Sequence, residues 1–311
     1  MSEPLVELDG LSKHFGAIKA LNDLSLTVPE GTVCGLLGPN GSGKTTAIKV
    51  LLGLSRPTAG SARLLGRTAA DGGFRSAIHQ TGSLIEGPAL YGRATARQNM
   101  RIQARARGLD DGEARITELL DLVGLTERAD SKARTFSLGM KQRLGLALAL
   151  IGDPRLVILD EPTNGLDPSG IVEIRELIKD LPQRGVTVLV SSHLLAEVQL
   201  MCDRVTIINR GKLIVDGTLD EVLAATGAAD GPLVKVDPAE SDAAVAALSA
   251  AGFAASSSQP GAIAVDGGRA GADITRALAG QGIYLSELRG SGADLESVFL
   301  TLTEGESGDA S

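Results

Sequence analysis

Eight residues, from Gly38 to Thr45, have the types and spacing that bind a polyphosphate. They read Gly-Pro-Asn-Gly-Ser-Gly-Lys-Thr and fit the pattern G-x-x-x-x-G-K-[ST]. The glycines let the backbone wrap closely around phosphates, so that its N–H groups point inward as donors. Lys44 supplies a cation for the β and γ phosphates, and Thr45 offers a hydroxyl to Mg²⁺. A glycine-rich turn that matches by chance is the alternative, and the predicted strand before the loop and helix after it argue against this.

Two carboxylates follow the apolar run Leu156 to Leu159. Such a run is typical of a buried parallel strand, and ligands bind at the carboxyl ends of these strands in open α/β sheets. We expect Asp160 to hold Mg²⁺ through water. Glu161 is then placed to polarise the attacking water, a general-base contribution of about 10²–10⁴ in rate. The alternative is that these are two acidic residues in a surface loop. The four apolar residues that lead directly into them argue against it.

Ser137 and His193 are candidates that need their context. Ser137 stands before an apolar helix predicted over Leu144 to Ile151, where it can cap the helix and meet an anion. Alone, this pattern indicates only a capped helix. His193 follows the buried-strand run Val186 to Val190. A lone histidine is more often structural, but this strand is expected to end at the same sheet edge as Glu161, which favours a sensor of the γ-phosphate.

The elements that must position these residues form an α/β domain. Leu5 to Leu8 and Leu24 to Val28 alternate like half-buried antiparallel strands, and Thr32 to Leu37 reads as a buried parallel strand. Short charged helical stretches from about 82 to 135 predict a helical insertion. Asn209-Arg210-Gly211 predicts a hairpin turn near the end of this domain, which we assign to residues 1–217.

The C-terminal part, residues 218–303, is rich in Ala, Gly and Ser. Its periodicity predicts the order β-α-β-β-α-β, the ferredoxin-like pattern, followed by a last helix over Leu295 to Leu302. The acidic residues 304–311 are expected to be a disordered tail. The predicted segments are strands at Leu233–Val236, Phe253–Ser257, Ile263–Asp266 and Tyr284–Leu288, with helices at Ser241–Ala250 and Asp273–Ala279.

Composition excludes several classes of protein. The net charge of -8 argues against nucleic-acid binding, because phosphate backbones attract an excess of Lys and Arg. The longest apolar stretch, near Leu144 to Ile151, is much shorter than the roughly 20 residues of a membrane span. The start, Met1-Ser2-Glu3-Pro4, lacks the pattern of a secretory signal. Cys34 and Cys202 have no metal-ligand spacing. A cytoplasmic protein is expected, and any membrane role then needs a partner.

Taken in order, these motifs resemble those of the ATP-binding subunits of ABC transporters, over about residues 15 to 217. Ser137 to Gln142 resembles the family's signature, usually L-S-G-G-Q. Asn164-Gly165-Leu166-Asp167 resembles its D-loop, and Ser191-Ser192-His193 its switch histidine. Phe15 lies where the family places an aromatic ring under the adenine, a stacking contact worth about 1–3 kcal/mol.

The resemblance implies an α/β P-loop NTPase fold with a mixed sheet core and a helical insertion, to which the C-terminal segments add the small α+β domain predicted above. It implies ATP and Mg²⁺ as ligands, with Lys44, Glu161 and His193 as catalytic residues. It also implies that two copies dimerise head-to-tail, so that Ser137 and Gly139 of one close over ATP held by Lys44 of the other. The implied nucleotide-binding residues are Phe15, Gly38, Pro39, Asn40, Gly41, Ser42, Gly43, Lys44, Thr45, Thr46, Ser137, Gly139 and Asp167.

Two departures from the family pattern are visible. Leu138 and Met140 replace a glycine and the glutamine of the signature, whereas Ser137 and Gly139 are retained. In the Q-loop, Glu86 stands where glutamine is usual, unless our alignment is misplaced. A carboxylate only accepts hydrogen bonds and carries charge. We therefore expect Glu86 to bind Mg²⁺ or water more strongly and to repel the γ-phosphate, which makes Thr45, Asp160 and Glu86 the predicted metal residues.

The glutamate and the run S-L-G-M-K-Q-R-L resemble ATPases of bacitracin-resistance and lantibiotic-immunity transporters. The C-terminal extension resembles that of anthracycline-type drug exporters. The predicted function is ATP hydrolysis that powers export of, or resistance to, an antibiotic, peptide or similar amphiphile. A separate membrane permease is the implied partner, with this chain peripheral on the inner face of the cell membrane.

Two other classes of function remain open at this stage. The first is a soluble ABC ATPase that acts on ribosomes or DNA, which the single phosphate loop and the absence of heptad runs disfavour. The second is a regulatory module without catalysis, against which Lys44, Asp160, Glu161 and His193 argue because all four are retained.

Overall fold

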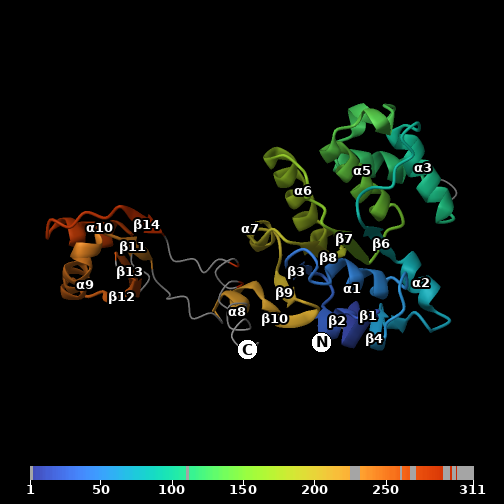
Figure 1. Ribbon diagram of the computed structural model, residues 1–311. Coiled ribbons are helices and arrows are strands. Elements are labelled where there is room, and N and C mark those ends of the chain that lie inside the picture. The colour runs from blue at the N-terminus through green and yellow to red at the C-terminus, as the bar shows by residue number, and fades with distance from the viewer. Residues whose placement is uncertain are drawn as a thin grey trace. The chain divides into compact units, whose positions relative to one another are not determined.

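The computed structural model describes residues 3–109, 112–224, 232–259, 261–266 and 271–289, together with Leu295 and Phe299. The chain divides into two compact units, Met1–Leu219 and Asp220–Ser311 (Figure 1). Sequence placed the boundary two residues earlier, after residue 217. Most of the predicted last helix and all of the predicted acidic tail lie outside the described residues.

The first unit is built on a six-stranded mixed sheet. Its five central and edge strands β9, β3, β8, β7 and β6 run parallel, and β10 is antiparallel to β9. The fully buried strands β3, β7 and β8 match the apolar runs seen in the sequence. In sheet order the strands are β10 (Lys212–Thr218), β9 (Arg204–Asn209), β3 (Val33–Leu37), β8 (Thr187–Ser192), β7 (Leu156–Asp160) and β6 (Thr81–Leu84).

The hairpin between β9 and β10 is the one the sequence predicts. Its two loop residues, Arg210 and Gly211, have φ of +47° and +77°. Positive φ at both positions is what a type I′ turn requires.

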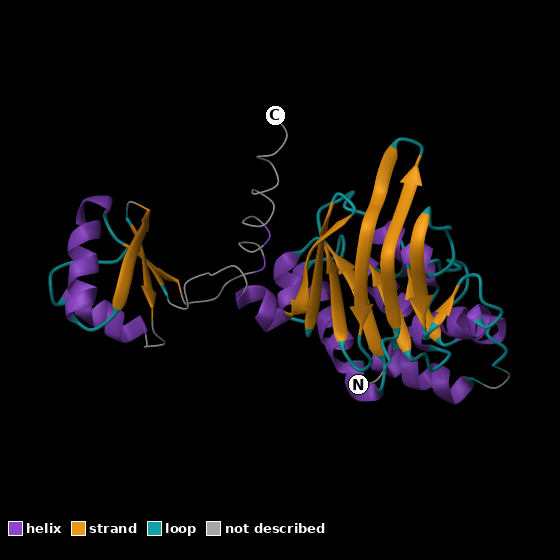
Figure 2. Cartoon of the chain, turned by 90° about the horizontal axis from the view of Figure 1, so that it is seen from below, coloured by secondary structure: helices purple, strands orange, loops and turns teal. Residues whose placement is uncertain are grey.

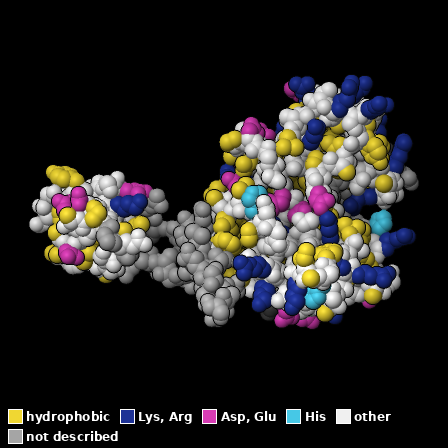
Figure 3. Space-filling view, in the orientation of Figure 1, with side chains coloured by type: hydrophobic (Ala, Val, Ile, Leu, Met, Phe, Trp, Pro, Cys, Tyr) yellow, Lys and Arg dark blue, Asp and Glu magenta, His cyan; other side chains and the backbone are white. Residues whose placement is uncertain are grey.

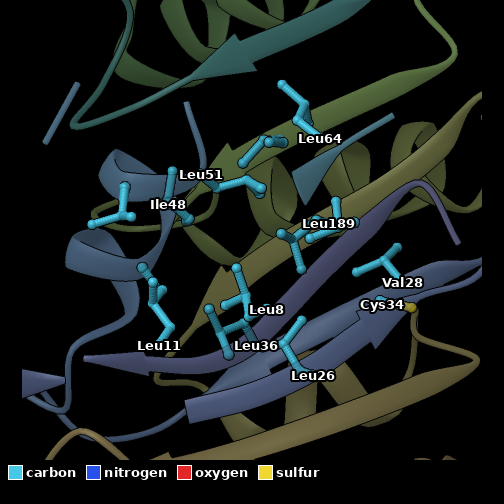
Figure 4. Packing of buried hydrophobic residues seen from close by; sticks show 14 of the residues in the cluster. Leu8, Leu11, Leu26, Val28, Cys34, Leu36, Ile48, Leu51, Leu64 and Leu189 are labelled. Atoms are coloured by element: carbon cyan, nitrogen blue, oxygen red, sulfur yellow. The ribbon is translucent and has the colours of Figure 1, made fainter. Parts of the chain in front are cut away.

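A second, antiparallel sheet packs with the first around α1 (Lys44–Leu51). Its strands, in order, are β2 (Ile18–Val28), β1 (Val6–Phe15), β4 (Ala59–Leu64) and β5 (Arg67–Thr68). Side chains from both sheets and from α1, among them Leu8, Leu36 and Ile48, form one buried cluster (Figure 4). This core fixes α1, and with it the phosphate loop, against the sheets.

A group of helices, α3 (Ala96–Ala106), α4 (Glu113–Leu122) and α5 (Leu138–Leu150), lies together beyond the sheet edge that β6 forms (Figure 1). The predicted start of this insertion, at about residue 82, is wrong. Residues Thr81–Leu84 form β6, which pairs with β7 in the main sheet. A Cβ on Gly82 would lie 2.2 Å from the carbonyl oxygen of Ala149, so the glycine lets α5 approach this strand. The first unit also contains the short helices α2 (Phe74–His79) and α7 (Leu195–Gln199) and the longer α6 (Pro168–Asp180), and α8 (Leu219–Ala224) begins at the boundary between the two units.

The second unit has a four-stranded antiparallel sheet with two helices on one face (Figure 2). Along the chain its elements follow the order strand, helix, strand, strand, helix, strand. Val234, Ile263 and Val265 alternate with exposed or half-buried neighbours and pack with Leu248 and Ile274 of the helices. The elements are β11 (Leu233–Lys235), α9 (Ser241–Ala250), β12 (Ala254–Gln259), β13 (Ala262–Asp266), α10 (Gly271–Ala279) and β14 (Glu287–Arg289), in the sheet order β12-β13-β11-β14.

Within the described ranges, no helix combines the length and the apolar character needed to cross a membrane.

Both cysteines are buried. Burial raises the pKa of the Cys34 thiol to about 11, and burial likewise raises the pKa of Cys202. Because the thiolate is the reactive form, we expect both thiols of the folded protein to react slowly with a disulfide reagent at pH 8. Denaturant should make both react at once.

The same shift predicts a loss of stability at high pH. The folded pKa of Cys34 exceeds its unfolded value near 9, so its contribution to the free energy of unfolding is complete below pH 9 and is lost as pH rises through about 11. Chemical denaturation at pH 8 and pH 11, compared with Cys34→Ala, measures this. For the reactivity prediction, fast reaction of either thiol of the native protein with the disulfide reagent would contradict the burial of Cys34 and Cys202.

Candidate nucleotide-binding and hydrolysis site

The phosphate loop joins the end of β3 to the start of α1. Gly38 has φ of +155° and Gly43 has φ of +110°. A Cβ on Gly38 would lie 2.2 Å from the carbonyl oxygen of Ile208, and one on Gly43 would lie 2.5 Å from that of Ala20. Only glycine fits both positions. They allow the chain to turn tightly enough to aim the N-terminus of α1, which carries no acidic residue in its first turn, at the concave side of the loop.

Lys44 is buried at the base of this loop. Its Nζ donates to the carbonyl oxygen of Gly38 at 2.7 Å and lies 3.2 Å from Oε1 of Glu161. The structure therefore brings together two predicted catalytic residues that are more than a hundred positions apart in the sequence. The ammonium group is the one cation that the predicted loop supplies to a bound polyphosphate.

Thr45 and Asp160 also meet, as the prediction of a shared metal site requires. The Thr45 hydroxyl donates to Oδ2 of Asp160 at 2.9 Å. The other carboxylate oxygen, Oδ1, accepts from the Ser191 hydroxyl at 2.5 Å. These contacts follow from the parallel sheet, because Asp160 and Ser191 are paired residues at the ends of β7 and β8.

Glu161 stands directly after β7 with φ of +51°, a left-handed conformation that is uncommon for a residue other than glycine. Its amide donates to the hydroxyl of Ser191 at 3.0 Å, which holds this turn. Its carboxylate contacts Lys44 through Oε1, and Oε2 lies 2.8 Å from Nδ1 of His193. The geometry thus gives a carboxylate oriented by two partners, as a general base needs to be.

Two adjoining hollows surround these groups. One, of about 200 Å³, is lined by Ala20, residues 40–46 and Glu161. The other, of about 790 Å³, is lined on one side by Thr45, Asp160 and Glu161 and on the other by Glu86 to Ala89, Leu138, Lys141 and Gln142. In Figure 3, acidic side chains gather on the face where the helical group meets the sheets. A polyphosphate and a cation would share this face.

The residues present fit ATP and Mg²⁺. The Ser42 hydroxyl is buried in the phosphate loop without a hydrogen-bond partner, which leaves it able to donate to a phosphate oxygen. Thr45 and Asp160 offer only oxygen ligands, the kind that Mg²⁺ prefers. Two such ligands are enough, because Mg²⁺ takes one or two protein ligands and completes its shell with water and substrate phosphates.

Other predicted residues lie apart from these contacts. The Ser137 hydroxyl accepts from the amide of Met140 at 3.2 Å and caps α5, and Asp167 caps α6 by accepting from Gly170. Neither of them, nor Gly139, lines the two hollows. Phe15 is 53% exposed at the end of β1, with the ammonium of Lys13 4.8 Å from its ring centroid. Glu86 lines the larger hollow, but its carboxylate pairs with Lys49 at 2.6 Å.

Sequence reasoning did not assign a role to Ser191 itself. It is fully buried and joins the Asp160 carboxylate to the Glu161 amide. Its position at the end of a predicted parallel strand was the available signal, since strand ends of one sheet lie side by side.

Comparison with known proteins agrees with this geometry. Residues 21–164 match the family described as ABC transporter. The uncharacterized ABC transporter ATP-binding protein YdbJ of Bacillus subtilis (strain 168) is 37% identical over 97% of this chain and 96% of its own length. The bacitracin transport ATP-binding protein BcrA of Bacillus licheniformis is 42% identical over 70% of this chain and 71% of its own. The lantibiotic transport ATP-binding protein SrtF of Streptococcus pyogenes is 42% identical over 70% and 92%.

Solved structures agree as well. An ATP-binding subunit of an ABC transporter superposes with a TM-score of 0.65 at 35% identity, over 72% of this chain and 93% of that one. A dimeric post-hydrolysis structure of the ATP-binding cassette MJ0796, bound to ADP and Pi, has a TM-score of 0.62 at 27% identity. The match covers 69% of this chain and 98% of that one. On these similarities and on the site described above, the chain belongs to the family of ABC transporter ATP-binding proteins and is an ATPase whose hydrolysis of ATP is coupled to transport.

Proposed function

We propose that this ATPase powers export of, or resistance to, an antibiotic, peptide or similar amphiphile through a separate membrane permease. The observation that carries the catalytic half of the proposal is the convergence of Lys44, Asp160, Glu161 and His193 at one sheet edge. The relatives named for bacitracin and lantibiotic transport support the substrate class. All these relatives are named as transport proteins, which favours this function over a soluble ATPase acting on ribosomes or DNA.

Within the site, we assign roles from contacts. The loop amides, the Ser42 hydroxyl and Lys44 bind the phosphates, while Thr45 and Asp160 hold Mg²⁺ when it is bound. The ion would neutralise phosphate charge. Glu161 accepts a proton from the attacking water, and His193, at 2.8 Å from that carboxylate, fixes its orientation and senses the γ-phosphate. The Ser191 hydroxyl, which donates to Asp160, fixes the orientation of the carboxylate that would hold the ion.

The complete site, in this proposal, needs a second copy of the chain. Ser137 is exposed, and Gly139 and Asp167 do not line the hollows of their own chain. A head-to-tail dimer would bring Ser137 and Gly139 of one copy over the nucleotide held by Lys44 of the other. The structure of MJ0796, which is a dimer bound to ADP and Pi, supports a dimer of the present chain. A place on the inner face of the cell membrane, held there by the permease, follows from the same proposal.

Co-expression tests the transport function. The chain is produced in a bacitracin-sensitive bacterium together with a candidate membrane permease, and the inhibitory concentration of bacitracin and of a lantibiotic is measured. We expect a several-fold rise for the native chain and none for Asp160→Asn, which loses the charge that Thr45 and Ser191 now contact. Asp121→Asn, on α4, is the matched control. Active ATP hydrolysis without any rise for either agent would refute bacitracin and the tested lantibiotic as its substrates.

A further inference from the structure

The ion pair between Lys49 and Glu86 has no assigned role. Nζ of Lys49 donates to Oε1 of Glu86 at 2.6 Å. Lys49 lies four residues after Thr45 on α1, and side chains four apart share one face of a helix. Thr45 donates to Asp160 at 2.9 Å, so the contacts Thr45–Asp160 and Lys49–Glu86 both start from one face of α1.

The partners of these two links are also neighbours. Strands β6 and β7 are parallel and adjacent, with Leu84 opposite Leu159. Glu86 follows β6 by two residues, and Asp160 is the last residue of β7. Parallel strands therefore bring both carboxylates to the same sheet edge, where α1 meets one with a hydroxyl and the other with an ammonium group.

Glu86 is held in a defined place by its backbone as well. Its φ is +55°, and Gly87 after it has φ of +100°. Two consecutive left-handed residues make a tight bend, which is unusual for a glutamate. The backbone of Lys49 is anchored too, because its carbonyl oxygen accepts from the amides of Leu54 and Ser55 at 2.8 and 3.1 Å. The pair thus joins two fixed segments, α1 and the bend after β6, and each of them contributes a residue, Thr45 and Glu86, to the lining of the larger hollow.

Charge makes this pair important to the nucleotide site. The hollow that Glu86 lines already contains Asp160 and Glu161. Lys44 is engaged with Glu161 at 3.2 Å, so it does not neutralise a third carboxylate. An unpaired charge on Glu86 would repel a bound triphosphate, and the repulsion would extend over about a Debye length of 8–10 Å.

We propose that Lys49 is the counter-ion that lets this chain carry a glutamate at the edge of its nucleotide site, by neutralising and positioning the Glu86 carboxylate. The inference rests on the proposed function, because it takes the neighbouring loop as the phosphate site. Lys49 is a positioning residue here and acts on the nucleotide only through Glu86.

A double-mutant cycle tests this with nucleotide binding as the readout. Binding of a non-hydrolysable ATP analogue is measured by calorimetry in EDTA, for the native chain, Lys49→Gln, Glu86→Gln and the double variant. The side chains of Lys49 and Glu86 are 38% and 65% exposed, so solvent screening limits the effect of the ion pair on binding. We expect Lys49→Gln to weaken binding about two- to fivefold at low salt. In the Glu86→Gln background the same change should have almost no effect.

Two controls sharpen the cycle. Lys49→Arg keeps the charge and should bind as the native chain does. Raising salt to about 0.5 M should reduce the effect of Lys49→Gln, because exposed charges are screened. Equal weakening in both backgrounds would show that Lys49 acts on the phosphates directly, and no weakening at low salt would show that it has no role. Either result overturns the inference.

The same binding experiment also tests the proposed nucleotide site separately, with the variant Lys44→Ala. If Lys44→Ala binds the analogue as tightly as the native chain, the phosphate-loop assignment fails. If binding depends on Lys44 but shows no coupling between Lys49 and Glu86, only the counter-ion role fails.

Discussion

ATP turnover by Glu161→Gln is expected to fall by about 10²–10⁴ while nucleotide binding persists. Glutamine has the shape of glutamate and can keep one contact to Lys44 and one to His193, which now lie 3.2 and 2.8 Å from the carboxylate. It cannot accept a proton from water. The bound nucleotide would then hold two copies together, because closure no longer ends in hydrolysis.

Two measurements separate these effects. Phosphate release in the steady state reports turnover, and size-exclusion chromatography with and without ATP and Mg²⁺ reports the dimer. The matched control is Glu127→Gln, an exposed glutamate in the segment between α4 and α5, which should change neither. Rapid phosphate release by Glu161→Gln would refute the assignment of Glu161 as the base.

The positions of three candidate site residues could be predicted from the sequence because each lies at, or directly after, the end of a strongly apolar strand. Asp160 is the last residue of β7, Glu161 follows it, and His193 follows β8 directly. Since these strands are parallel neighbours, finding them in the sequence was enough to place their ends together. The phosphate loop was predicted for a related reason, as its glycines and the helix after it are contiguous in the chain.

Strand β6 was missed because its sequence gives little local signal. Of its four residues, Thr-Gly-Ser-Leu, only Leu84 is a large apolar side chain. Its burial comes from contact with β7 and with α5, and Gly82 permits the latter approach. Such contacts join segments some seventy residues apart, so no periodicity within the strand reveals them.

The partner of Glu86 could not be predicted either. The sequence marks Glu86 as unusual, and the expectation was a metal ligand. The structure shows its carboxylate paired with Lys49, whose distance from it depends on how α1 lies against β7, the strand beside β6. A surface ion pair of this kind leaves no pattern in one sequence, because lysine and glutamate are ordinary residues on exposed helix and loop positions.

The last prediction tests whether each site is shared between two copies. The single substitution Lys44→Ala should abolish ATP turnover, because it removes the buried ammonium group from the phosphate loop. Ser137→Asp should do the same for another reason. Aspartate caps a helix as well as serine does, so α5 stays capped, but a carboxylate now faces the phosphate held by the other copy. Ser137→Asn, which caps without charge, is the control and should keep more activity.

Mixing the two inactive variants then distinguishes a head-to-tail dimer from a self-contained site. In a mixed head-to-tail dimer, both defects fall in one site and the other site has native Lys44 and native Ser137. Random pairing of equal amounts should restore on the order of a quarter of the native sites. A chain that carries both substitutions, mixed with native chain, should spoil both sites of each mixed dimer. The native pairs in this second mixture then leave about a quarter of its sites active, so a shared site predicts similar activity in the two mixtures. If the first mixture stays inactive while the second keeps about half of the native activity, Ser137 does not act across the interface, and the shared site is ruled out.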